Sequence, residues 1–96
     1  MGSPTTVKLR LYVAGGAPNA TQAIANLTAI CTESLPGCHE IELVDVFREP
    51  ERSLADGILM TPTLLRVAPL PILKIVGTLS QKKRVLQALG LERPTP

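Results

Sequence analysis

The sequence predicts a single α/β domain whose elements follow the order β-α-β-α-β-β-α. Three observations favour this class. Apolar and polar residues alternate over residues 7–13, which is typical of a strand with one wetter face. A stripe of apolar residues at helical spacing follows and stops at Pro36-Gly37. Two short apolar segments in the C-terminal half flank a turn with two prolines, which indicates a hairpin.

Length and composition fit one domain with an aliphatic core. The 96 residues are enough for one buried core but not for two. We expect residues 7–91 to form the domain, residues 1–6 to be a disordered segment or the remnant of a tag, and residues 92–96 to be a disordered tail. The core must be aliphatic, because 45% of the residues are apolar although the chain has only one Tyr and one Phe.

Charge and cysteine content argue against several classes of partner and location. Ten Lys and Arg against eight Asp and Glu give a formal net charge of +2, which is too small to indicate a nucleic-acid partner. No apolar run approaches about 18 residues, so we expect no membrane-spanning segment. Two cysteines are too few for a secreted disulfide scaffold, and we therefore expect a cytoplasmic protein.

The first helix is expected after the glycine-rich turn that ends the first strand. Asn19 is placed to cap this helix, and Gln22 follows three residues later, as in a variant of the capping box. The inward stripe of the helix comprises Ala20, Ala23, Ile24, Leu27, Ile30 and Cys31. Residues 40–47 indicate a second strand, and we place it nearer the centre of the sheet because it is more continuously apolar than the first.

The second half predicts a short helix, a hairpin and a last helix. Pro50 suits the first turn of the short helix, and Gly57 suits the residue that follows its end. Residues 63–68 and 73–77 are the expected strands of the hairpin. Ser80 is placed to cap the last helix, whose inward face comprises Val85, Leu86 and Leu89.

This order of elements is that of the thioredoxin fold. In such folds a proline after a cis peptide bond precedes the penultimate strand and exposes a stretch of backbone beside the start of the first helix. Thr61-Pro62-Thr63 occupies that place. Because X-Pro is a tertiary amide, the cis form costs only about 0.5–1 kcal/mol there. The alternative is a trans proline at the first residue of an edge strand.

The thiol chemistry of that fold is missing from the sequence. A thioredoxin-type oxidoreductase needs a cysteine at the N-terminus of the first helix, where the helix dipole lowers the pKa of the thiol. Residues 15–21 contain none, whereas Cys31 falls on the apolar stripe and Cys38 lies beyond it. His39 has no identifiable nucleophile partner, and with the two cysteines it is one ligand short of a structural zinc site. The sequence predicts no catalysis, no cofactor and no metal.

Three segments give the chain a resemblance to the KaiB family. They are LYVAGGAPNATQAIANL at residues 11–27, VDVFREPE at 44–51 and ILMTPTLLRVAPLPILKIVGTLS at 58–80. The resemblance extends from about Lys8 to Leu89 without evident gaps. It implies a non-enzymatic regulator of circadian-type clocks that binds the ATPase and autokinase KaiC, sequesters KaiA and displaces the histidine kinase SasA.

The resemblance also implies that the chain exchanges between two folds. One is a tetramer with the element order βαββααβ, and the other is a thioredoxin-like monomer that binds KaiC. The residues that we expect to decide between them are Thr61, Pro62, Thr63, Gly77, Thr78 and Asn19. Three cations at residues 82–84 crowd the first turn of the last helix, where each opposes the helix dipole by about 0.3–1 kcal/mol. The alternative interpretation of these cations is an ordinary exposed helix face.

Two basic residues match the partner-binding surface of clock KaiB proteins, namely Arg66 and Lys74. Four positions depart from the family pattern: Gln22, Gly57 and Leu73 stand where basic residues are usual, and Thr78 stands where aspartate is usual. Since charge pairs set association rate and partner choice, these departures predict weaker or redirected binding to an acidic face. We therefore expect a divergent paralogue.

The expected partner is a KaiC-like ATPase, with KaiA or a SasA-type kinase as further partners. A homo-oligomer, either a dimer or a tetramer, is expected as well. Two alternatives use the same scaffold. One is the sensor domain of a SasA-type histidine kinase, and the other is a thioredoxin-like enzyme or a stress-related chaperone.

Overall fold

The structure, a computed structural model, describes residues 6–91. The expected segments 1–6 and 92–96 lie outside the described residues, apart from residue 6. The elements follow the predicted order, which is thereby confirmed, and the order βαββααβ is not the one described. They are β1 (Val7–Val13), α1 (Pro18–Ser34), β2 (His39–Asp45), α2 (Pro50–Ala55), β3 (Thr63–Ala68), β4 (Leu73–Val76) and α3 (Lys82–Ala88).

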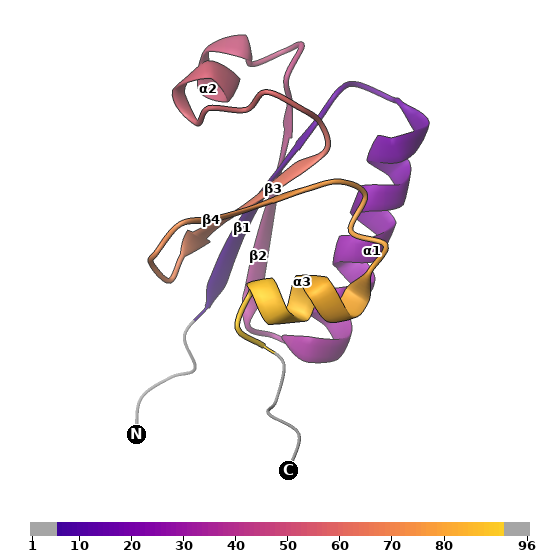
Figure 1. The fold of residues 1–96 in the computed structure, drawn as a ribbon, viewed down its shortest axis with the longest axis vertical. Helices are drawn as coiled ribbons and strands as arrows, with labels where there is room; N and C mark the ends of the chain where they lie inside the picture. Colours follow the sequence, from indigo (N-terminus) through magenta and orange to yellow (C-terminus); the bar gives the residue numbers. More distant parts are fainter. Residues whose placement is uncertain (1–5, 92–96) are drawn as a thin grey trace.

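The four strands form one sheet with the order β2-β1-β3-β4. β1 runs parallel to β2 and antiparallel to β3, and β3 runs antiparallel to β4. The connection from β1 through α1 to β2 is the crossover that a parallel pair requires. Figure 1 shows α1 and α3 side by side, with α2 set apart from them. The predicted hairpin of β3 and β4 is confirmed.

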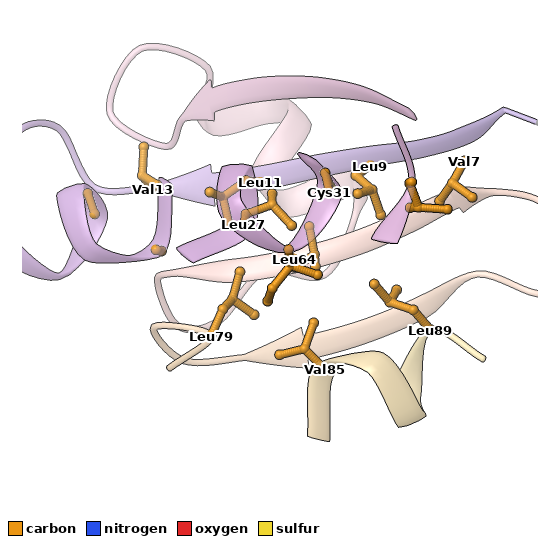
Figure 2. Close-up of a cluster of buried hydrophobic side chains, with 14 residues drawn as sticks. Val7, Leu9, Leu11, Val13, Leu27, Cys31, Leu64, Leu79, Val85 and Leu89 are labelled. Atoms are coloured by element: carbon orange, nitrogen blue, oxygen red, sulfur yellow. The ribbon is translucent and has the colours of Figure 1, made fainter. Parts of the chain in front are cut away.

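The main core lies between the sheet and the two helices α1 and α3. Figure 2 shows Leu11 and Leu64 of the sheet together with Leu27 of α1 and Val85 of α3. Leu11, Leu27 and Leu64 are fully buried. The core is aliphatic, as the composition predicted, because no aromatic residue belongs to this cluster.

A smaller cluster lies on the opposite face of the sheet, where α2 packs. It consists of Tyr12, Val44 and Leu65, with Val46, Ile58 and Val67 partly buried against it. Tyr12 is the largest fully buried side chain among residues 6–91. Because alternate residues of a strand point to opposite faces, β1 supplies Leu11 to the main core and Tyr12 to this second one.

The predicted central position of β2 is wrong, because β2 is an edge strand. Val44 is its only buried residue. Ile41 and Leu43 lie on the side of the main core but at its margin, and 38% and 51% of their surfaces are exposed. The continuous apolar run of β2 therefore belongs to an edge strand that is only partly covered, and not to a central strand that is covered on both faces.

The predicted caps of α1 and α3 are also wrong. α1 begins at Pro18, and the residue that precedes it is Ala17, which has no side chain able to accept a hydrogen bond; Asn19 and Gln22 are therefore inside the helix. Proline is well suited to that first position because its missing N–H would be unpaired there. α3 begins at Lys82 after Gln81, so Ser80 does not cap it. The predicted roles of Pro50 and Gly57 around α2 are confirmed, with Gly57 at φ +69° just beyond the helix.

Candidate interaction surface

Thr61-Pro62-Thr63 lies at the end of the sheet where β1 ends and β3 begins. The Thr61-Pro62 peptide bond is cis, and β3 is an interior strand, so the trans edge-strand alternative is wrong. Thr63 pairs with Tyr12 in the sheet, and its hydroxyl donates to the Met60 carbonyl at 2.6 Å. The Pro62 carbonyl accepts from the Gly77 N–H at 2.9 Å, which fixes the start of β3 to the end of β4.

The segment that leads into this bend exposes large apolar side chains. Leu59 is 93% exposed and Met60 is 64% exposed, and Leu54 of α2 is also exposed. Single exposed apolar residues are common on protein surfaces, whereas a contiguous apolar patch marks an interaction site. Leu59 and Met60 are consecutive and lie directly before the bend, so the bend is bordered by exposed apolar side chains.

The two thiols lie away from the start of α1. Cys31 is completely buried in the main core, and burial raises the pKa of its thiol to about 11. Cys38 is partly buried, and both cysteines are free. The His39 ring nitrogen Nδ1 lies 2.8 Å from the Leu35 carbonyl oxygen. Among residues 6–91, no group of three His, Cys, Asp or Glu side chains is placed to hold a metal ion.

The two predicted partner-binding cations lie on opposite faces of the hairpin. Arg66 is on the side of α3, where Nη1 donates to the Leu89 carbonyl at 3.1 Å and Nη2 to the Pro71 carbonyl at 3.0 Å. Lys74 is exposed on the side of α2, where Nζ donates to the Gly57 carbonyl at 3.0 Å. Arg66 is thus occupied in holding the end of α3 to the hairpin, while Lys74 is open to a partner.

The Gly77-Thr78 turn connects β4 to α3. Gly77 has φ +118°, a conformation that favours glycine, and Leu79 has φ +64° although it carries a buried side chain. The Asn26 side-chain amide of α1 donates to the Thr78 carbonyl at 2.8 Å. The role of Asn26 could not be predicted from the sequence, because this contact links residues that are far apart in the chain.

A network of charged side chains fixes α2 to the sheet, and sequence reasoning missed it. Arg10 of β1 pairs with Glu42 of β2 at 2.8 Å and with Asp56 at 2.9 Å. Arg52 of α2 pairs with the same Glu42 carboxylate at 2.8 Å and with Glu49 at 3.1 Å. The buried Tyr12 hydroxyl donates to Asp56. The alternation of residues in β1 places Arg10 and Tyr12 on one face of the strand. This was the one feature of the sequence that pointed to the network.

The network shifts the pKa values of its members. Hydrogen bonds from Arg52 and then Arg10 lower the pKa of Glu42 to about 2. The hydrogen bond from Tyr12, followed by that from Arg10, lowers the pKa of Asp56. Burial and the contact with Asp56 raise the pKa of Tyr12. All three shifts favour the arrangement in which the carboxylates are charged and the phenol is neutral.

Acid is expected to loosen α2 from the sheet. Because the folded pKa of Glu42 is depressed, its contribution to stability is complete above the unfolded value of about 4.3 and disappears as the pH falls toward about 2. Urea unfolding of the wild type and of Glu42→Gln at several pH values measures this. The difference between their midpoints should shrink as the pH falls below about 5. A difference that stays constant with pH would contradict the role of the Glu42 carboxylate.

Charge is divided between the two halves of the chain. Residues 57–91 carry five Lys and Arg and no Asp or Glu, whereas residues 6–56 carry four Lys and Arg against seven Asp and Glu. The cationic half comprises β3, β4 and α3. The acidic half contains β2, whose exposed carboxylates are Glu40 and Glu42. Lys82 of α3 pairs across this division with Glu33 of α1.

The fold and the site together define a thioredoxin-like domain whose first helix begins without a thiol. Solved structures agree on the fold. The N-terminal domain of Synechococcus elongatus SasA matches with a TM-score of 0.75 and 15% identity, covering 100% of this chain and 94% of that one. Oxidised mitochondrial thioredoxin 3 from Saccharomyces cerevisiae matches with a TM-score of 0.70 and 14% identity, covering 91% and 77%. At these identities the likeness shows the fold alone.

The sequence comparisons identify the family. The KaiB domain matches residues 10–91. The circadian clock oscillator protein KaiB of Microcystis aeruginosa is 42% identical over 86 residues, which cover 90% of this chain and 83% of that protein. The circadian clock protein KaiB3 of Synechocystis is 40% identical over 86 residues, covering 90% and 82%. The chain belongs to the KaiB family, which confirms the resemblance seen in the sequence.

Proposed function

We propose that this chain is a non-enzymatic clock regulator that docks on a KaiC-like ATPase. The observation that carries the proposal is the charge division in a KaiB-family chain. Among its charged residues, residues 57–91 have only cations, and Lys74 is exposed at a position where the resemblance predicts partner binding. Lys74 contacts the Gly57 carbonyl, and the exposed Leu59 and Met60 follow Gly57 by two and three residues. An exposed cation near exposed apolar side chains fits an acidic partner face.

Two further observations support regulation by contact rather than by turnover. α1 begins without a cysteine, and the thiol of Cys31 is buried with a raised pKa. The same free thiols support a reducing, cytoplasmic location as part of the proposal. Among residues 6–91, the structure has no helix with the length and hydropathy that a membrane span needs. KaiA and a SasA-type kinase remain proposed as further partners.

Exchange with the order βαββααβ is also part of the proposal. The two helices of the second half, α2 and α3, are short. α2 is tied to the sheet mainly by the charged network, and α3 has seven residues, no side-chain cap and cations in its first turn. Leu79 adds an unfavourable positive φ, which costs about 1–2 kcal/mol. A segment with such elements can adopt two packings whose free energies differ by only a few kcal/mol.

Charge reversal at Lys74 is expected to weaken the complex. Binding of the purified chain to a KaiC-type ATPase is measured by surface plasmon resonance with ATP and with ADP. Lys74→Glu should raise the dissociation constant at least about tenfold, mainly through slower association, because it places an anion against an acidic face. Amide NMR of the complex reports which of the two folds is bound.

Arg48→Glu is the matched control. It makes the same charge change on an exposed side chain outside residues 57–91. We expect it to change the dissociation constant less than about twofold. Equal losses for the two variants would contradict the assignment of the docking face, and failure of the wild-type chain to bind in either nucleotide state would overturn the proposed function.

A further inference from the structure

Arg66 is bound to backbone carbonyls rather than to a carboxylate. Its Nη1 donates to the carbonyl of Leu89, the residue that follows α3, and its Nη2 donates to the carbonyl of Pro71 in the hairpin turn. Both acceptors are neutral. A carboxylate can accept two parallel hydrogen bonds from one guanidinium and adds the attraction between opposite charges. Arg66 is therefore held by weaker acceptors than those that a guanidinium can bind.

The hydrogen-bonding capacity of Arg66 is only partly used. A guanidinium has five N–H donors. The Nε atom of Arg66 is buried, and it has no hydrogen-bond acceptor within the described part of the chain. None of the ion pairs formed by residues 6–91 includes Arg66. Because a buried donor without an acceptor is unfavourable, a carboxylate that reached this side chain would gain more than it displaces.

The segment that this side chain holds comprises Leu89, Gly90 and Leu91, which we call the α3 end turn. The N–H of Gly90 donates to the Gln87 carbonyl at 3.1 Å, and the N–H of Leu91 donates to the Leu86 carbonyl at 2.8 Å. The α3 helix itself has only seven residues. A turn with so few hydrogen bonds, at the end of a short helix, opens at a lower free energy than the strands of the sheet.

We propose that the α3 end turn is an autoinhibitory contact, which withholds Arg66 until a carboxylate of an acidic partner segment displaces the Leu89 carbonyl from the guanidinium. The inference rests on the proposed function in one respect, namely that the partner is acidic. The acidic segment binds the open turn better than the closed turn, so it shifts the equilibrium toward the open one. Because such coupling is reciprocal, closing the turn lowers the affinity for the acidic segment by the same factor.

A purely structural role of Arg66 has different consequences. As a clamp alone, the side chain stabilises the α3 end turn, and its loss loosens the turn. An acidic segment then has no effect on the turn of the wild type, because it does not compete for the guanidinium. The response of the α3 end turn to an acidic probe therefore separates the two roles.

Amide hydrogen exchange followed by NMR tests the competition, with poly-L-glutamate as the acidic probe at ~0.01 M salt, where exposed charges are weakly screened. In the wild type, saturating polymer should speed the exchange of the Gly90 and Leu91 amides about fivefold or more. In Arg66→Gln these amides should exchange faster from the outset, and the polymer should add nothing. Arg84→Gln is the matched control, since it removes the same charge from an exposed residue of α3 and should keep the response.

Gly90→Ala tests the coupling from the opposite direction. Gly90 has φ +72°, where a Cβ is unfavourable, and among the described residues no atom lies within 4 Å of that Cβ. The substitution therefore strains the closed turn without a clash, and it should lower the dissociation constant for polyglutamate about threefold or more. Gly37→Ala is the matched control, because Gly37 has φ +70° and equally open surroundings beyond the end of α1. It should change the constant less than about twofold.

Two results would overturn the proposal. One is exchange of the Gly90 and Leu91 amides that polyglutamate leaves unchanged in the wild type, whether the polymer binds elsewhere or not at all. The other is an equal change of affinity in Gly90→Ala and Gly37→Ala. Circular dichroism of each variant verifies that it is folded. The experiment contains no ATPase, so its failure leaves the proposed docking function untouched, whereas failure of that function shows as a lack of binding to the ATPase.

Discussion

Leu64→Ala is expected to lower the free energy of unfolding by about 2–5 kcal/mol. Leu64 is completely buried in β3, at the place where the layers of α1 and α3 meet the sheet (Figure 2). Truncation of Leu64 removes apolar contacts and leaves a cavity. The neighbouring residues, which belong to two helices and a strand, cannot close this cavity completely. A loss of this size is a large part of the stability of a small domain.

Urea denaturation followed by far-ultraviolet circular dichroism measures this effect. The matched control is Leu54→Ala, which makes the same chemical change on an exposed residue of α2 and should alter stability by less than about 0.5 kcal/mol. If the two variants were equally stable, the described packing of β3 against α1 and α3 would be wrong.

Tyr12→Phe is expected to cost about 1.5–3 kcal/mol, although it removes a single oxygen atom. The hydroxyl is the neutral donor to the Asp56 carboxylate, and Asp56 follows directly on the end of α2. Hydrogen bonds to charged groups are the stronger kind, and this one lies beside the smaller core. The effect should concentrate on the attachment of α2, which amide hydrogen exchange of residues 50–57 detects.

A double-mutant cycle separates this bond from other effects of the substitution. Asp56→Ala alone leaves the Tyr12 hydroxyl without its carboxylate, and the double variant should cost less than the sum of the two single ones by about 0.5–3 kcal/mol. Glu51→Ala, which removes an exposed carboxylate of α2, serves as the control and should stay within about 0.5 kcal/mol of the wild type. Strict additivity of Tyr12→Phe and Asp56→Ala would contradict the bond.

The order of the elements could be predicted because it depends on local signals. These signals extend over only a few residues: they are the alternation in β1, the helical spacing in α1 and the prolines of the hairpin. Each was sufficient to predict the type of its element. The predicted cap positions were wrong by one or two residues. Asn19 was expected to precede α1, but the helix already begins at Pro18. Boundaries of this kind depend on backbone angles that several side chains tolerate.

The position of β2 and the surroundings of the two basic residues could not be predicted, because both depend on strand register. An apolar run such as that of β2 occurs in central strands and also in edge strands whose margin is uncovered. Arg66 and Lys74 look alike in the sequence, but Arg66 pairs with Leu73 and Lys74 pairs with Leu65. This register sends them to opposite faces, so one of them holds α3 and the other meets solvent.

The charged network escaped prediction for the same reason. Arg10 and Glu42 are neighbours only because β1 and β2 pair in register, and Asp56 joins them only after α2 has folded back over the sheet. No local pattern connects residues that are 46 positions apart, as Arg10 and Asp56 are. A sequence reader could have noted that Arg10 and Tyr12 share one face of β1, but not what covers that face.

The burial of Cys31 gives the molecule an intrinsic chemical reporter. An alkylating reagent can approach the sulfur of Cys38, which is partly accessible, while α1 still lies on the sheet. It reaches the sulfur of Cys31 only after that helix has lifted. The ratio of the two labelling rates therefore measures how often the native packing opens, without any label having to be introduced by mutation.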